Sequence, residues 1–328
     1  MRTYTTLARP IAVLGLTAFA VTACGDTTTP VAPVVPTAPS LAKGGPKMPT
    51  TNGRIYFTSS FAGNFDVYSM NPDGSDRRRL TSTVDGEHHL NVSKDGKKLV
   101  IGNRPTNPER RQLVTMNVDG TNRRVLLTND ASSAVAWPTF SPDGRTIAYV
   151  STHSSEPNTF SIWSVSASGG KVTRLTPPTQ SALYPSWSPD GTQIVYVGAA
   201  PGTQGFDLYI MNADGSGPQL LHECVDGCQF PVWTPDGSKI VYISRNVDGW
   251  QLQSCDLLKA IPVCGTQIAH EGLPTMVAVS PDGTQLVTMA QTWENTTVDR
   301  ITTSNINGSA QTALTANLWA IGAVAWGR

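Results

Sequence analysis

A twelve-residue phrase with a central Asp-Gly pair recurs along most of the chain. Its five copies are VSKDGKKLVIGN, FSPDGRTIAYVS, WSPDGTQIVYVG, WTPDGSKIVYIS and VSPDGTQLVTMA. Their aspartates, Asp95, Asp143, Asp190, Asp236 and Asp282, follow one another at intervals of 48, 47, 46 and 46 residues. A period in the forties made of short strands is typical of a β-propeller, in which each repeat forms one blade. The repeat therefore predicts an all-β fold.

Turn signals divide each repeat into strands. Asp-Gly favours a two-residue hairpin turn, whose central residues adopt positive φ. A second turn follows 24 or 25 residues from the first where both occur, at Asp73-Gly74, Asp119-Gly120, Asp214-Gly215 and Asn307-Gly308, with Ser168-Gly169-Gly170 as a variant. We expect the repeat aspartates to be structural, with carboxylates that accept hydrogen bonds from nearby backbone amides.

The two ends of the repeat region set the number of blades. Five full units each begin with an inner strand, which leaves residues 54–83 at the front and the strand 322–328 at the back. Together these two pieces complete one shared blade, and ring closure removes open sheet edges. The sequence thus predicts a six-bladed β-propeller of four-stranded blades over residues 54–328.

The start of the chain has the composition of an export signal. Arg2 and Arg9 precede an uncharged apolar run over residues 11–23, which is shorter than the roughly 20 residues of a transmembrane helix. The following Val21-Thr22-Ala23-Cys24 resembles a bacterial lipobox, which implies that Cys24 receives a diacylglyceryl group and becomes the mature N-terminus. The alternative is a plain signal peptide cut near Ala23. Residues 24–53, rich in Thr and Pro, form a tether after the signal peptide at 1–23.

The repeat also resembles that of a known family. The phrase W-S-P-D-G-x-x-I-x-Y, followed by D-x-Y-x-M-N-x-D-G and R-L-T, is similar to the propeller repeat of the TolB family, over residues 54–328. The resemblance does not extend to the α/β domain that precedes the propeller in TolB, since nothing between Cys24 and Gly53 matches it. It implies a TolB-like propeller lipoprotein, exported and anchored by lipid on the periplasmic side or at the cell surface.

Four cysteines remain when Cys24 is assigned to lipid. Cys224 and Cys228 bracket a Val-Asp-Gly turn, and Cys255 and Cys264 flank the last two strands of a blade without the second Asp-Gly turn. In an oxidising compartment we expect disulfides Cys224–Cys228 and Cys255–Cys264. The alternative is a Cys₄ zinc site, although the spacing lacks paired C-x-x-C units.

The sequence contains none of the common catalytic motifs. No G-x-S-x-G, H-E-x-x-H or P-loop is present. Only His88 and His89 are adjacent, and neighbours on a strand point to opposite faces unless a bulge intervenes. Balanced charge, 24 basic against 24 acidic residues, argues against a general nucleic-acid binder. We expect no metal, no other cofactor and a monomer.

Repeat-aligned positions identify a candidate binding rim. The positions four residues before the serine or threonine of each phrase hold His89, Trp137, Tyr184, Phe230 and Met276. They open the inner strands around the channel, so we expect an aromatic-rich ring at one mouth. The positions three later, Phe140, Trp187, Trp233 and Trp326, are expected to pack between blades. Aromatic rings at a concave site favour binding, although these side chains could instead only plug the mouth.

These features favour a non-enzymatic scaffold that binds a protein or peptide partner in the cell envelope through one propeller face. The alternative is an oligosaccharide-binding or lyase-type enzyme that uses the channel. Such an enzyme requires a metal or a cluster of basic residues inside the ring, and the repeat-aligned positions offer only His89. A third possibility is a purely structural envelope component.

Overall fold

The computed structural model describes residues 53–328 except 105–109, 131–133, 154–155, 200–204, 248, 293–294, 316–317 and 320. The signal peptide and tether, including Cys24, lie outside the described residues. Within the described part of the chain all regular structure is β-strand. No helix there is long and apolar enough to cross a membrane.

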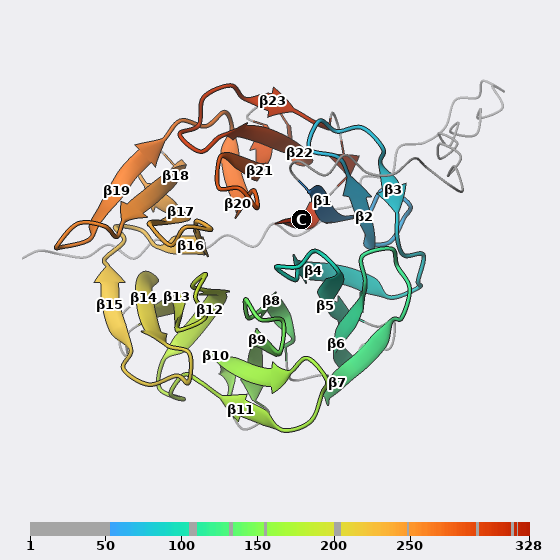
Figure 1. Ribbon diagram of the computed structural model, residues 1–328, viewed down its shortest axis with the longest axis horizontal. Coiled ribbons are helices and arrows are strands. Elements are labelled where there is room, and N and C mark those ends of the chain that lie inside the picture. The colour runs from blue at the N-terminus through green and yellow to red at the C-terminus, as the bar shows by residue number, and fades with distance from the viewer. Residues whose placement is uncertain are drawn as a thin grey trace, which may run out of the picture. The chain divides into compact units, whose positions relative to one another are not determined.

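The strands form six antiparallel sheets that follow the chain order (Figure 1). Blade 1 combines β25 (Ile321–Gly327), β1 (Arg54–Ser59), β2 (Asp66–Met70) and β3 (Arg78–Arg79). Blade 2 contains β4 (Gly86–Val92), β5 (Lys98–Arg104), β6 (Arg110–Asn117) and β7 (Arg124–Asp130). Blade 3 contains β8 (Ala136–Phe140), β9 (Thr146–His153), β10 (Glu156–Ser166) and β11 (Val172–Arg174).

The second half of the ring repeats this order. Blade 4 contains β12 (Ser181–Trp187), β13 (Gln193–Ala199), β14 (Asp207–Asn212) and β15 (Gln219–His222). Blade 5 contains β16 (Cys228–Trp233), β17 (Lys239–Asn246), β18 (Gly249–Asp256) and β19 (Val263–Ile268). Blade 6 contains β20 (Leu273–Val279), β21 (Gln285–Thr292), β22 (Asn295–Asn305) and β23 (Thr312–Ala313), and β24 (Leu318–Trp319) pairs with β22.

The ring closes through blade 1, as the repeat count predicted. β25 from the C-terminal end pairs with β1, with Trp326 opposite Ile55 and Val324 opposite Phe57. The inner strands β25, β4, β8, β12, β16 and β20 contact one another in succession, and β20 contacts β25 again. The prediction of a six-bladed propeller closed by a shared blade is therefore confirmed.

The core is divided among the junctions between blades. Six clusters of buried side chains occur in the described residues, and each contains residues from two neighbouring blades. The predicted inter-blade positions belong to them: Phe140 and Trp233 are buried members, Trp187 packs against the cluster between blades 3 and 4, and Trp326 lies between blades 6 and 1. Hydrophobic burial between blades thus holds neighbouring sheets at a constant spacing.

The Asp-Gly phrase forms a longer turn than the two-residue type predicted. In the first copy the Ser93 amide donates to Lys98 O at 2.9 Å and the Gly96 amide donates to Ser93 O at 2.8 Å, so four residues lie between the paired ends. Only the glycine has positive φ, 70° at Gly96. The predicted turn type is wrong because the Ser93 hydroxyl donates to Asp95 at 2.6 Å and stabilises the wider loop.

The predicted structural role of the repeat aspartates is confirmed. In the third copy, Asp190 Oδ1 accepts from the Ser188 hydroxyl at 2.6 Å and from the Thr192 amide at 3.0 Å. These hydrogen bonds hold the pKa of the Asp190 carboxyl below its usual range.

Candidate functional site

All six inner strands contain a one-residue bulge at the same level of the propeller. In β8, Ala136 and Thr139 pair with Val150 and Ala148, so one residue of β8 has no partner in β9. Corresponding register shifts occur in β4, β12, β16, β20 and β25. A bulge bends its strand and re-aims the adjacent side chains. The bulges therefore change the direction in which the neighbouring side chains of each inner strand point.

Three of the predicted rim residues occupy a strained backbone conformation at these bulges. Trp137, Tyr184 and Phe230 have φ of 45°, 53° and 48°. This left-handed region costs a residue with a Cβ about 1–2 kcal/mol. His89 and Met276 are not in this conformation and pair with Gly102 and Met289.

The structure brings four of the five predicted rim residues into one row. The ring centroids are 5.0 Å apart from His89 to Trp137, 4.5 Å from Trp137 to Tyr184 and 4.1 Å from Tyr184 to Phe230. All four side chains are partly exposed. We call these four residues the aromatic row. Met276, the fifth predicted rim residue, packs against buried clusters that contain Ile321 and Ala323.

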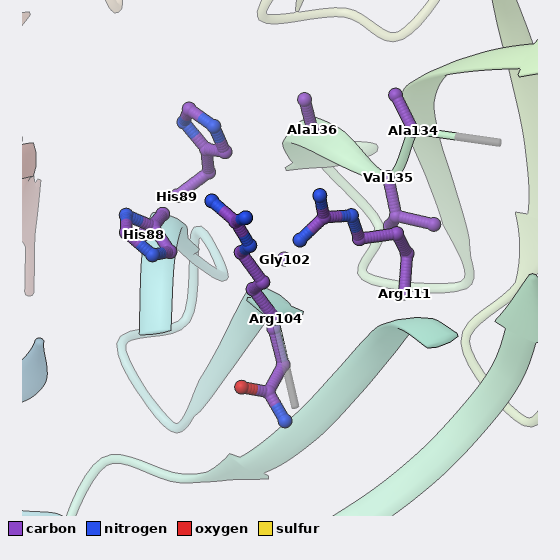
Figure 2. A pocket seen from close by; sticks show the side chains of 9 residues that line it. His88, His89, Gly102, Arg104, Arg111, Ala134, Val135 and Ala136 are labelled. Carbon is purple, nitrogen blue, oxygen red and sulfur yellow. The ribbon is translucent and has the colours of Figure 1, made fainter. Parts of the chain in front are cut away.

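A cavity of about 260 Å³ adjoins the His89 end of this row (Figure 2). β4 supplies His88 and His89, β5 supplies residues 102–104, and β6 supplies Arg111. The opposite wall is residues 134–136, where the chain enters β8. At Gly102 an added Cβ would lie 2.9 Å from the carbonyl oxygen of Val135, so glycine permits this wall to approach β5.

The expectation that His88 and His89 face opposite sides is wrong at this site. The register shifts between Glu87 and His89, and both histidines line the cavity. Their ring centroids are 6.5 Å apart, and the ring of His88 also lies 4.5 Å from that of Phe65. The bulge interrupts the two-residue alternation on which the expectation depended.

The charged side chains among the described residues that line the cavity are basic. Burial lowers the pKa of His89 to about 4, so His89 is neutral near pH 7. Burial, and then the charges of Arg104 and Arg111, lower the pKa of His88. The pKa of Arg111 is also lowered, first by burial and then by Arg104, although a guanidinium stays protonated at physiological pH. Two cations therefore face the same partly enclosed space.

Sequence reasoning missed the basic residues of this cavity. Arg104 and Arg111 lie on the second and third strands of blade 2, outside the repeat-aligned rim positions. The repeat pattern gave no signal for Arg104, since the same position holds Thr152, Ala199, Arg245 and Gln291 in the other copies.

Both predicted disulfides are present in the structure. Cys224 bonds to Cys228 immediately before β16, and Cys255 in β18 bonds to Cys264 in β19. Cys224, Cys228 and Cys255 are buried in the junction between blades 4 and 5. The first bond lies two residues from Phe230 and so restrains the chain that leads into the aromatic row.

Metal ligands do not gather in the described part of the propeller. No group of three or more His, Cys, Asp or Glu side chains there could hold a metal ion. The proposed lipidation residue, Cys24, lies outside the described residues.

Solved structures with similar folds include TolB proteins and a lyase. TolB from Acinetobacter baumannii aligns with a TM-score of 0.68 at 16% identity, over 84% of this chain and 67% of its own. A TolB from Agrobacterium tumefaciens aligns with a TM-score of 0.60 at 18% identity, over 82% and 91%. An oligogalacturonate lyase in complex with manganese aligns with a TM-score of 0.56 at 16% identity, over 79% and 73%. At these identities the likeness establishes the fold alone.

Comparison of the sequence with family models identifies the protein family. A search of curated proteins finds no significant match. The family model for the TolB β-propeller domain matches residues 128–328, more than half of the chain and four of the six blades from the end of β7 onward. The closed six-bladed ring and this match together show that the chain belongs to the TolB β-propeller domain family.

Proposed function

We propose that this protein is a non-enzymatic binding module of the cell envelope, which holds a protein or peptide segment at the channel mouth. The observation that carries the proposal is the aromatic row, in which four rings from four successive blades are in contact and remain partly exposed. Trp and Tyr contribute most strongly to binding energy at protein interfaces. Strained backbone at Trp137, Tyr184 and Phe230 supports a functional role, because such strain concentrates at binding sites.

A cross-linked capture experiment from the native envelope tests the row. Wild-type protein is compared with Trp137→Ala/Tyr184→Ala and with the control Trp163→Ala/Tyr209→Ala. The control removes the same residue types from the third strands of the same two blades, β10 and β14. We expect one partner to be captured by the wild type and the control and lost with the row variant. The captured protein is then purified and its affinity measured by calorimetry, and equal affinity for all three proteins contradicts the proposal.

Membrane attachment through Cys24 is a separate part of the proposal. The apolar run that ends at Val21-Thr22-Ala23 supports lipidation of the following cysteine, and two or more acyl chains give stable anchoring. Cells that express Cys24→Ala are fractionated beside the wild type. We expect the variant to leave the membrane fraction and the mature wild-type protein to carry the mass of a lipid. A wild-type protein without that mass refutes the anchor and leaves the binding proposal in place.

A further inference from the structure

Two arginines in the cavity beside the aromatic row have no protein counter-ion among the described residues. The ion pairs among the described residues are formed by other arginines, namely Arg54, Arg78, Arg79 and Arg123. The Asp85 carboxylate accepts a hydrogen bond from the side-chain amide of Asn103 at 3.4 Å. Arg104 is exposed and Arg111 is partly buried. Among the described residues, the pair therefore presents positive charge without an ion-pair partner to whatever enters the cavity.

The geometry of the cavity suits a small planar anion. Figure 2 shows the guanidinium groups of Arg104 and Arg111 turned toward the same space, with His88 and His89 on one side and Val135 on the other. Guanidinium groups bind carboxylates through two parallel N–H···O bonds. The volume of about 260 Å³ holds a group of side-chain size rather than a folded domain.

The cavity is continuous with the aromatic row. His89 belongs to both, since it lines the cavity and its ring lies 5.0 Å from that of Trp137. The successive ring separations of 5.0, 4.5 and 4.1 Å correspond to about four residues of extended chain. A short peptide can thus contact the rings and reach the arginines at the same time.

The tilt of the rings favours a peptide over a sugar chain. Successive rings of the row are inclined to one another by 54°, 63° and 43°. A pyranose stacks its flat face on the open face of an aromatic ring, and rings that meet edge to face cover one another's faces. The crevices between tilted rings instead accept the side chains of a peptide.

We propose that the cavity lined by Arg104, Arg111, His88 and His89 binds a carboxylate of a peptide that lies along the aromatic row, an inference that rests on the proposed function. The carboxylate is either an Asp or Glu side chain or the C-terminus of the peptide, at most about four residues from the segment that contacts the rings.

The test uses the mature full-length protein and two synthetic octapeptide libraries. Both contain Asp, Glu, Asn, Gln and apolar residues at random positions, and one ends in a free carboxylate while the other ends in an amide. We expect the wild type to retain peptides with a carboxylate near apolar residues. Preference limited to the first library identifies a C-terminal carboxylate, whereas preference for Asp or Glu in both libraries identifies a side chain.

Matched variants assign this preference to the cavity. We expect Arg104→Gln/Arg111→Gln to bind the best retained peptide about 10- to 100-fold more weakly, as for loss of charged hydrogen bonds. Arg104→Lys/Arg111→Lys keeps the charge and is expected to keep the preference for carboxylates. The control Arg110→Gln/Arg145→Gln removes the same charge from two exposed side chains outside the cavity and is expected to bind as the wild type does.

The outcomes separate this inference from the proposed function. If wild type retains peptides without a carboxylate preference, or the Gln variant binds as tightly as wild type, the carboxylate site is refuted. Loss of binding in Trp137→Ala/Tyr184→Ala under those conditions leaves the proposed function standing. If no peptide is retained, the carboxylate site is refuted and the capture experiment alone decides the proposed function. If trigalacturonate binds more tightly than any peptide, both are refuted.

Discussion

Replacement of Tyr184 by glycine and by alanine measures the backbone strain that positions the aromatic row. Both substitutions remove the same partly exposed ring, and they differ in the backbone preference of the new residue. At a φ of 53° alanine carries a cost of about 1–2 kcal/mol that glycine avoids. The greater chain entropy of unfolded glycine offsets about 0.5–1 kcal/mol of this gain. We therefore expect Tyr184→Gly to be more stable than Tyr184→Ala by about 0.7 kcal/mol.

A control in a regular strand should show the reverse order. Tyr209 in β14 pairs with Tyr196 in an uninterrupted antiparallel register with β13, and its side chain is also partly exposed. There we expect Tyr209→Ala to be more stable than Tyr209→Gly by about 0.5–1 kcal/mol. Urea unfolding followed by fluorescence gives the free energies, and 1 kcal/mol shifts the midpoint by about 0.3 M or more. Alanine equal to or better than glycine at position 184 refutes the strained bulge.

Three further predictions concern stability. Trp326→Ala is expected to lower the free energy of unfolding by about 3–5 kcal/mol, because this side chain is only 7% exposed and packs the closing strand into the junction of blades 6 and 1. The control Ile261→Ala removes a side chain that is 80% exposed and should change the free energy of unfolding by less than about 0.5 kcal/mol in the same urea titration. Cys255→Ser/Cys264→Ser removes a disulfide between cysteines nine residues apart and is expected to lower the free energy of unfolding by about 2–3 kcal/mol. A reductant should lower the calorimetric Tm of the wild type more than that of this variant. Burial lowers the pKa of His89 in the folded protein to about 4, whereas the unfolded value is about 6.5. Between these two pH values the unfolded state binds more protons than the folded state. The free energy of unfolding should therefore decrease as the pH falls through this range, by at most about 3 kcal/mol. Unfolding titrations from pH 8 to pH 4 should show a smaller loss in His89→Phe, and equal losses would contradict this assignment.

The architecture was predictable because its information is local and repeated. Each copy of the Asp-Gly phrase marks the same turn, and five equally spaced copies leave only one arrangement for the two end segments. The turn type was wrong for a local reason, since the Ser93 hydroxyl bond to Asp95 and the pairing of Ser93 with Lys98 make a wider loop. The two strands that the turn connects are the same whichever turn type joins them.

The candidate site was predicted only in part. Counting back from each phrase located His89, Trp137, Tyr184 and Phe230, which do form a continuous row. The same rule included Met276, which packs against clusters that contain Ile321 and Ala323 of the closing strand. The family match, residues 128–328, begins after β4, β5 and β6, so it does not cover the blade that supplies the cavity's histidines and arginines.

The sequence by itself determined the number of blades, the shared blade and the inner-strand positions of the aromatic row, although these residues lie within their strands and do not open them. Spacing in the chain is sufficient for these features because a propeller repeats one short-range unit. Only the tertiary structure decided that one bulge per inner strand places His88 beside His89 and that Arg104 and Arg111 converge on them. A bulge changes the direction of the side chains near it, but it leaves unchanged the hydrophobic sequence pattern from which strands are predicted. Convergence of groups from three strands and a neighbouring blade is set by packing, which no single repeat encodes.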